Sequence, residues 1–513
     1  MSRAAEILVV GAGPTGLTLA LQAHDHGARV RIVERRREAF RPSRALILHP
    51  RTLEVLRPLG VTERLLARAD IAPEAHLHLG RRVVPVRLAD LALPDTAFPH
   101  LSLVRQTEVE EVLAQALADR GVGVERGTAL IETEDGLERA RAILRSAGAD
   151  EQAEFDFVVG CDGQESTVRH SARIGWQGAP YVEEVVLADL EVDSDLAAGV
   201  AHVVAGARGL LFLFALGERA TWRMLATRPA ALDSFPFGQP GPSVPLADLQ
   251  ALIRDASLDA RITDVVWSAR YRLQHRLAER FREGRLFLAG DAAHAHSPAT
   301  GQGMNTGIQD AVNLGWKLAF ATPSSDSEGL LASYQVERRP VARRLLALTH
   351  FAFLAEASSN SLLSLLRGVL APLGAPVIPV LAGHRMLVAE VIRVVSQWRM
   401  GYPNSNLSID GDPPATIWPR PGHRLPDESV TCEGQITRLH TLMARAGIHV
   451  LLGRDAARIE NLSLGPHVTV HRLTSAEGTG LVAVRPDGYV GFRCGIADEI
   501  QLRSWLRSIC AGA

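Results

Sequence analysis

The sequence predicts an α/β fold in several parts, with a central parallel sheet, an inserted β-rich segment and a separate C-terminal unit. Three observations predict this class. A buried strand at residues 7–10 runs into a glycine-rich turn and an apolar helix, and two later strands also end in glycine turns, at 160–163 and 290–303. Residues 185–270 form short apolar runs separated by Gly, Pro and Asp, which is typical of strands. At roughly 100 to 200 residues per domain, the 513 residues hold about three or four structural units.

The first turn has the pattern G-x-G-x-x-G in the order strand, turn, helix, second strand. Gly11 allows the tight turn, Gly13 lets the backbone approach a pyrophosphate, and Gly16 lets the helix pack on the strand. The second strand, residues 28–33, ends in Glu34, a carboxylate placed to accept a ribose hydroxyl. The pattern predicts a Rossmann-like dinucleotide site, with a purely structural glycine turn as the alternative. The arginines at 35–37 are interpreted as a solvated edge rather than a 2′-phosphate site.

The two later turns carry an aspartate each. Residues 157–160 lead into Asp162 and Gly163, and residues 286–289 lead into Gly290 and Asp291. A strand that ends in Gly-Asp can offer its carboxylate to a polyol hydroxyl. The glycine-rich loop 301–305 then enters a helix, so free backbone N–H groups at the start of the helix would face negative charge that develops on a bound ligand. His294 and His296 stand beside this turn and are expected to be packed, hydrogen-bonded structural residues, with a catalytic base as the alternative.

At these residues the chain resembles the group A flavoprotein aromatic hydroxylases, the para-hydroxybenzoate hydroxylase-like FAD monooxygenases. Within them it is similar to the branch that acts on phenols and aromatic polyketides. The first turn with Glu34 matches the family's first FAD motif, residues 160–163 match its Asp-Gly motif with Cys161 replacing a small residue, and residues 290–305 match its second FAD motif. Residues 334–340 and 485–489 also look similar, so the resemblance covers the whole chain.

The resemblance implies a set of site residues. FAD would be held by Gly11, Gly13, Pro14, Thr15, Gly16, Glu34, Arg35, Arg44, Arg105, Gln106, Asp162, Gly163, Gly290, Asp291, Pro298, Gly301, Gly303, Met304 and Asn305. Arg44, Pro298 and Gly301 would also serve catalysis beside the flavin ring. No metal site is expected.

The resemblance also implies the reaction. NADPH or NADH, as a transient co-substrate, would reduce the FAD, and O2 would then add to give a C4a-hydroperoxide that hydroxylates an aromatic small molecule. No second G-x-G-x-x-G follows a strand, so no dedicated nicotinamide domain is expected. Two alternatives stay open: a Baeyer-Villiger or epoxidising monooxygenase, and a flavoprotein that mainly sequesters its ligand. The substrate, the position hydroxylated, the choice of nicotinamide nucleotide and the substrate-deprotonating base are left open by the sequence.

The expected domains follow the chain. Residues 1–175 and 270–350 would form a discontinuous FAD domain of the glutathione reductase type, and 176–269 a β-rich substrate domain. A hairpin at 76–88 could join the same sheet. Residues 351–400 would be a helical connection, and 401–513 a linker and thioredoxin-like domain without C-x-x-C. Phe212 and Phe214, which share one strand face, and Trp222 are candidate substrate contacts. His76, His78 and His202 are the nearest guesses for a base.

Charge and cysteine content exclude other classes. The 55 Lys and Arg against 57 Asp and Glu give a formal charge of −2, so nucleic acid is not an expected partner. The four cysteines form no C-x-x-C pair, which favours a reducing cytoplasm. The apolar run 361–383 contains Arg367 and three prolines, so no membrane span is expected. A monomer or a homodimer is expected.

Overall fold

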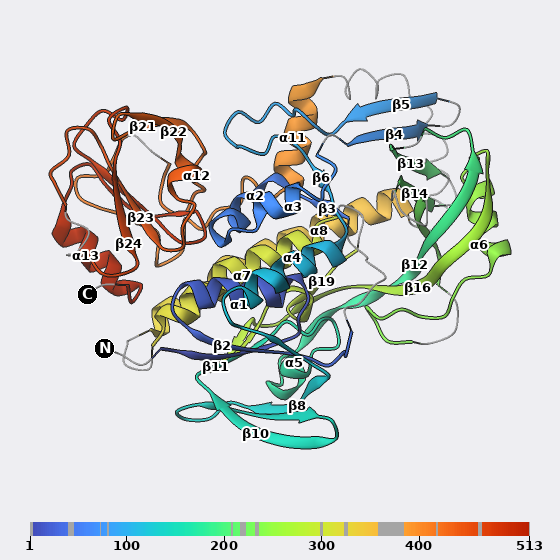
Figure 1. Cartoon of the computed structure of the whole chain (residues 1–513), viewed down its shortest axis with the longest axis horizontal. Coiled ribbons are helices and arrows are strands. Elements are labelled where there is room, and N and C mark those ends of the chain that lie inside the picture. The colour runs from blue at the N-terminus through green and yellow to red at the C-terminus, as the bar shows by residue number, and fades with distance from the viewer. Residues whose placement is uncertain are drawn as a thin grey trace.

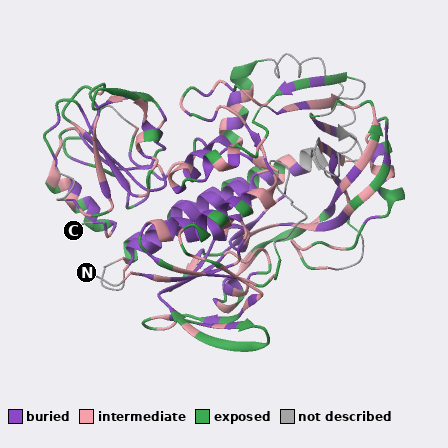
Figure 2. Ribbon diagram, viewed as in Figure 1, coloured by how far each residue is buried: buried purple, intermediate pink, exposed green. Residues whose placement is uncertain are grey.

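The computed structural model describes residues 4–38, 46–71, 73–79, 82–197, 199–206, 209–215, 222–230, 235–297, 301–322, 327–357, 384–416, 419–459 and 464–511. Figure 1 shows a central unit with helices stacked above a sheet, a second and larger sheet on the right, and a C-terminal unit on the left. Figure 2 shows buried residues in the helices of the central unit and in the strands of the C-terminal unit. Among the described residues, no helix is both long and apolar enough to cross a membrane. The apolar run 361–383 lies outside the described residues.

The central unit is built on a six-stranded sheet of order β17-β18-β11-β1-β2-β7. Its strands are β1 (Glu6–Val10), β2 (Arg29–Glu34), β7 (Val124–Arg126), β11 (Phe157–Gly160), β17 (Arg282–Glu283) and β18 (Leu286–Leu288). All neighbours pair in parallel except the edge strand β17. Parallel strands are covered on both faces, which explains the continuous apolar runs in β1 and β11. The pairing of β11 with β18 shows that a late segment completes the sheet that contains β1.

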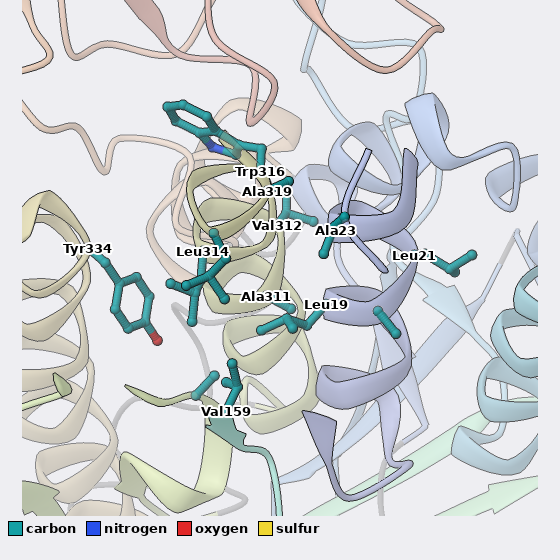
Figure 3. Packing of buried hydrophobic residues seen from close by; sticks show 14 of the residues in the cluster. Leu19, Leu21, Ala23, Val159, Ala311, Val312, Leu314, Trp316, Ala319 and Tyr334 are labelled. Carbon is teal, nitrogen blue, oxygen red and sulfur yellow. The ribbon is translucent and has the colours of Figure 1, made fainter. Parts of the chain in front are cut away.

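Helices and a small sheet cover the two faces. Above the sheet lie α1 (Pro14–Asp25), α4 (Gln106–Ala118) and α7 (Gly303–Phe320), and below it lie α5 (Thr167–Ser171) and the three strands β8 (Thr128–Glu134), β9 (Ala140–Ser146) and β10 (Ala149–Phe155). Figure 3 shows Leu19 and Ala23 of α1 directed towards Ala311 and Val312 of α7. Small side chains at this contact let the two helices that carry the first and third turns approach closely.

Short elements connect β2 to α4. They are β3 (Ile47–Leu48), α2 (Pro50–Leu56), η1 (Arg57–Leu59), α3 (Thr62–Leu66) and β6 (Ser102–Leu103). β3 and β6 pair antiparallel, and Val104 N donates to Leu46 O at 2.9 Å. This places the start of α4 beside residues 46–48.

The inserted segment forms an eight-stranded sheet of order β19-β16-β12-β15-β14-β13-β4-β5. Its strands are β4 (Glu74–Leu79), β5 (Arg82–Arg87), β12 (Trp176–Ser194), β13 (Ala201–Gly206), β14 (Gly209–Ala215), β15 (Trp222–Pro229), β16 (Ala260–Ala278) and β19 (His294–Ala295). The hairpin expected at 76–88 is β4–β5, and it joins this sheet through a parallel pair with β13. β16 runs through the domain boundary expected at 269–270 and pairs with β12 on both sides of it, so this boundary falls inside a strand of the second sheet.

Two helices meet this sheet on opposite faces. α6 (Leu246–Asp255) packs its Leu249 and Ile253 against Met224 and Leu213. α8 (Glu328–Ala357) reaches the other face, where Phe353 packs against Phe212. The α8 side is the one that faces the central unit.

The C-terminal unit has its own mixed sheet of order β20-β26-β25-β23-β24. Its elements are β20 (Ile409–Asp410), β21 (Ser429–Cys432), β22 (Gln435–Arg438), α12 (Leu439–Leu442), β23 (Ile448–Leu452), β24 (Val468–Arg472), β25 (Leu481–Val484), β26 (Val490–Cys494) and α13 (Glu499–Ser508). It follows α11 (Arg385–Val395), the described helix of the segment expected to be a helical connection. That this unit is thioredoxin-like stays a prediction.

A buried ionic network fixes this unit to the central one. The Glu337 carboxylate of α8 accepts hydrogen bonds from the two terminal guanidinium nitrogens of Arg485, both at 2.7 Å. It also accepts one from Nζ of Lys317 in α7 at 2.7 Å. Asp487 accepts from Arg485 and from Nδ2 of Asn313 at 2.9 Å. Each of these side chains is almost completely buried. The network therefore joins α7, α8 and the C-terminal unit at one point.

Candidate functional site

The three glycines of the first turn have different surroundings. Gly11 has a φ of +102°, and a Cβ added there would lie 2.4 Å from Cys161 O. A Cβ on Gly16 would lie 1.9 Å from Gly11 O, whereas a Cβ on Gly13 would meet nothing within 4 Å. Gly11 and Gly16 thus serve packing, and the backbone at Gly13 faces open space at the start of α1. Pro14 opens that helix, where its missing N–H costs no hydrogen bond. This is the geometry of an anion site at a helix N-terminus.

Glu34 ends β2 next to this turn. Its carboxylate accepts Ala12 N at 3.0 Å and Arg36 N at 2.9 Å, so it is held against the turn with lone pairs to spare. Arg35 is exposed and lines an open cleft of about 550 Å³ together with Glu165, Phe235, Pro236, Phe237, Gln239 and Arg272. Arg35 therefore lies on a nucleotide-sized surface cleft beside the turn.

The third turn packs directly on the first. A Cβ on Gly290 would lie 2.6 Å from Thr15 Oγ1, and one on Gly307 of α7 would lie 2.2 Å from the same atom. Gly290 N donates to Asp310 Oδ2 at 3.1 Å. Asp291 is half-buried, with Gln164 Nε2 at 3.5 Å from its Oδ2. The fold thus brings together Thr15 and Gly290, which lie far apart in the sequence.

Asp162 follows β11 at the same end of the sheet. Its Oδ2 accepts Thr167 N at 2.7 Å and so caps α5, while its Oδ1 is buried and has no partner among the described residues. Burial raises the pKa of this carboxyl above its ordinary value. Gly163 comes next, and its Cβ position is open. Asp162 therefore holds the start of α5 with one carboxylate oxygen, and its other oxygen has no partner among the described residues.

The loop 301–305 holds two amides with contrasting environments. Asn305 Nδ2 donates to Ile47 O and Gly301 O, both at 2.9 Å, and its Oδ1 accepts His49 N at 3.0 Å and Thr52 Oγ1 at 2.7 Å. All four hydrogen-bonding positions of Asn305 are used within the chain, so its side chain shapes the loop and does not contact a ligand. Gln302 is also buried, yet neither its Oε1 nor its Nε2 has a partner in the described part of the chain.

An unpaired buried amide is costly, so a polar partner outside the described residues is expected for Gln302. Gln302 lies within the loop 301–305 that was expected to face the ligand, although it was not singled out as a site residue. Its position between two glycines of the loop was the available signal. Gly303 and Met304 begin α7 directly after it.

Arg105 and Gln106 lie close to the loop 301–305. Arg105 precedes α4, where its backbone N–H donates to Glu108 Oε2 at 3.2 Å, and Gln106 Nε2 donates to Glu110 Oε1 at 2.8 Å. The start of α4 lies beside residues 46–48, to which Asn305 is bonded. Arg44 and Pro298 lie outside the described residues.

The two histidines of the third turn are packed, as expected. His294 Nε2 lies 2.6 Å from Asp310 Oδ2, and Arg338 Nε donates to Asp310 Oδ1 at 2.6 Å. These three side chains are completely buried. His296 Nδ1 bonds Ser297 O at 2.9 Å. His294 and His296 therefore stabilise the third turn through these hydrogen bonds.

The substrate candidates lie on two different faces. Phe212 and Phe214 stack with ring centroids 5.6 Å apart, half-buried, on the α8 side of the sheet. Trp222, the third candidate, lies on the other face of the sheet. Trp222 pairs with Ala215, so it has the opposite orientation to Phe214 and packs with Met224 and Leu249 on the α6 side.

The three histidines named as possible bases belong to the α6 side as well. His202 lies 5.5 Å from Trp222 between ring centroids, and its Nδ1 is 3.0 Å from His78 Nε2. His76 stands edge-on to His202 at 5.4 Å. They lie on the wrong face to reach a molecule beside Phe212.

The fold and these turns define a class: a dinucleotide-binding protein in which the third glycine turn faces the first at the end of a parallel sheet. The open backbone at Gly13, the Glu34 carboxylate and the unpaired amide of Gln302 fit FAD. Residues 4–349 match the family FAD binding domain, and residues 418–513 match the family Aromatic-ring hydroxylase, C-terminal.

Similar proteins agree with these matches. The 6-methylpretetramide 4-monooxygenase of Streptomyces rimosus is 37% identical over 374 residues, which are 72% of this chain and 64% of that protein. The 12-dehydrotetracycline 5-monooxygenase/anhydrotetracycline 6-monooxygenase of Streptomyces rimosus subsp. rimosus is 31% identical over 513 residues, 94% of each chain. The structure of an anhydrotetracycline hydroxylase from Streptomyces rimosus superposes with a TM-score of 0.78 at 28% identity and covers 99% of this chain and 100% of its own. The chain belongs to the FAD-dependent aromatic-ring hydroxylases.

Proposed function

We propose that the protein is an NAD(P)H- and O2-dependent FAD monooxygenase that hydroxylates a planar aromatic substrate of the polyketide type. The observation that carries the proposal is the packing of the third glycine turn on the first, at Thr15 and Gly290. That packing would assemble one dinucleotide site from two segments of the central unit that lie far apart in the sequence. The aromatic face of the second sheet then lies next to its flavin end.

The residues that would hold FAD follow from their positions. The backbone at Gly13 would receive the pyrophosphate, Glu34 the adenosine ribose and Asp291 a ribityl hydroxyl. Gln302 and the N–H groups that open α7 would face the polar edge of the ring. When bound, FAD accepts a hydride from NAD(P)H and activates O2 for insertion into the substrate.

The chain's own contribution is binding, orientation and exclusion of water. Phe212, Phe214 and Phe353 give the substrate side an apolar, aromatic surface that suits a flat ring system. Water next to the reacting atoms would divert activated oxygen, so this surface protects the reaction. The named activities of the tetracycline relatives support a polycyclic aromatic substrate.

The first test is a turnover assay with purified protein and FAD. NADPH and O2 consumption is followed with phenols, naphthoquinones and anhydrotetracycline, and products are analysed by mass spectrometry with 18O2. We expect substrate-stimulated NADPH oxidation and a product with one added oxygen atom from O2. A lactone or an epoxide would replace hydroxylation by the Baeyer-Villiger or epoxidising alternative. Binding without any NADPH oxidation would indicate a sequestering protein.

A matched pair of variants tests the cofactor assignment. Asp291→Ala removes the carboxylate and should lower FAD retention through gel filtration, whereas Asp291→Asn keeps a hydrogen-bonding oxygen and should retain more. Equal retention by the wild type and both variants would remove Asp291 from the site.

A further inference from the structure

A polar cluster lies among the apolar side chains on the α8 face of the second sheet. It consists of Tyr181 of β12, His275 of β16 and His350 of α8. The Tyr181 hydroxyl is 3.1 Å from His350 Nδ1, and the ring centroids of His275 and His350 are 4.5 Å apart. All three side chains are half-buried, and Phe353 packs on Tyr181 with centroids 4.5 Å apart. Three segments far apart in sequence therefore converge at one point.

The cluster is continuous with both parts of the proposed site. Tyr181 belongs to the same apolar group as Phe212, Val203 and Leu273 on the strands. On its other side the Tyr181 hydroxyl hydrogen-bonds the side chain of Ser297, the last described residue before the loop that enters α7. The cluster thus stands between the aromatic strands and the third glycine turn.

Hydrogen-bond donors and acceptors fix the state of His350. Ser297 Oγ donates its single proton to the Thr349 carbonyl at 3.1 Å, since a carbonyl only accepts. With its proton used, Ser297 Oγ can only accept from the Tyr181 hydroxyl beside it, whose pKa burial raises to about 12, so that it stays protonated. Tyr181 in turn accepts from Nδ1–H of His350. In the neutral ring this leaves a lone pair on His350 Nε2, to which no described residue hydrogen-bonds.

His275 completes the arrangement. Its Nδ1 is buried and without a partner in the described part of the chain. Burial and the neighbouring His350 lower the pKa of His275, so it remains neutral beside a ring that gains a proton. A neutral neighbour avoids the repulsion that a second imidazolium would bring.

We propose that His350 Nε2 is the base that takes the proton of a phenolic hydroxyl on the substrate, and that Tyr181 is the positioning residue that holds His350 in the required tautomer. The inference rests on the proposed function and specifies its substrate as a hydroxylated aromatic. In the step, the substrate O–H bond breaks, an N–H bond forms on Nε2, and the products are a phenolate and an imidazolium. No electron is transferred. The phenolate raises the electron density of the ring carbons at which oxygen is inserted.

The first test uses ionisation of 4-nitrophenol, whose phenolate is yellow, and needs no turnover. Difference spectra are recorded with the FAD-loaded protein at a pH where the free probe is mostly protonated. We expect the wild type to shift the bound probe towards phenolate. His350→Gln should abolish the shift while the probe still perturbs the flavin spectrum, and Tyr181→Phe should reduce it several-fold. His78→Gln, on the α6 face, should behave as the wild type.

The second test compares 1,8-dihydroxyanthraquinone with its dimethyl ether during turnover. We expect oxygen incorporation into the dihydroxy compound to fall about 100-fold in His350→Gln, a size typical of a lost general base. NADPH oxidation should continue, with the oxygen released as peroxide. Added imidazole should restore part of the incorporation in His350→Gly.

The outcomes separate the two ideas. The inference is overturned if the wild type does not ionise 4-nitrophenol, or if both His350→Gln and Tyr181→Phe match the wild type. If no compound gains oxygen with the wild type, the proposed function fails, while the ionisation experiment still decides the role of His350.

Discussion

At the scale of single residues, Gly13 and Gly16 separate ligand binding from packing. Gly13→Ala should leave the unfolding free energy of the FAD-free protein within about 0.5 kcal/mol, because its Cβ enters open space. FAD affinity should fall at least tenfold, since the methyl group occupies the approach to the backbone. Gly16→Ala should destabilise the FAD-free protein by about 1 to 3 kcal/mol through overpacking. Urea denaturation and FAD titration measure the two effects. Equal loss of stability in both variants would contradict this division.

The unpaired amide of Gln302 gives a second prediction at this scale. Gln302→Leu removes two buried polar atoms without partners, so the FAD-free protein should be equally or more stable. The rise in melting temperature on adding FAD should shrink, because the ligand loses its contact with this side chain. Thermal scans with and without FAD test it, with Asn305→Leu as the contrast. That variant should destabilise even the FAD-free protein, because all hydrogen bonds of Asn305 lie within the chain.

The sequence predicted the glycine turns well because each is local, with strand, turn and helix contiguous. The face of the sheet on which Trp222 lies could not be predicted, for a physical reason. Alternation along one strand shows that Phe212 and Phe214 share a face, but the face of the next strand depends on the register set across the connection. Tyr181, His275 and His350 carried no sequence signal at all, because only the tertiary fold brings them together.

At the scale of elements, the Glu337–Arg485 pair holds the C-terminal unit on α7 and α8. Burial raises the pKa of Glu337, but Arg485 and Lys317 lower it by more, so this pKa lies below its ordinary value. Glu337→Gln should lower the unfolding free energy by about 3 to 5 kcal/mol, because it leaves Arg485 and Lys317 buried with too little negative charge. Urea denaturation measures the loss. The surface variant Glu477→Gln is the control. If Glu337→Gln unfolds at the same urea concentration as the wild type, the Glu337–Arg485 pair does not stabilise the protein.

Element order was predictable where a glycine motif or a short turn marks the elements. The interrupted central unit and the hairpin at 76–88 were both expected, and both are present as β1–β11–β18 and β4–β5. The boundary expected at 269–270 falls inside β16, which pairs with β12 on both sides of it, and a continuous strand shows no break in its pattern at such a point.

At the scale of the whole molecule, buried histidines make stability depend on pH. Burial lowers the pKa of His26, His49 and His449 from 6.5 to about 4. Between pH 6.5 and 4 the unfolded chain binds more protons than the folded one, so stability is full above pH 6.5 and falls as the pH drops. Each group contributes up to about 1.4 kcal/mol per pH unit.

Urea unfolding of the FAD-free protein at pH 7.5, 6 and 5 tests this slope. His26→Gln should reduce the slope by the share of one group, while the exposed His423→Gln should leave it unchanged. A free energy of unfolding that stays constant between pH 7.5 and 5 would contradict the prediction.

The pairing of β1 with β11 and of β11 with β18 also sets a schedule for biogenesis. A ribosome that has made the first 160 residues has released the first glycine turn but neither β18 nor α7, which span residues 286–288 and 303–320. At roughly 5 to 20 residues per second, translation to the end of α7 takes roughly 15 to 65 s. The proposed flavin site, which needs both the first and the third glycine turns, can therefore be complete only after α7 has been made.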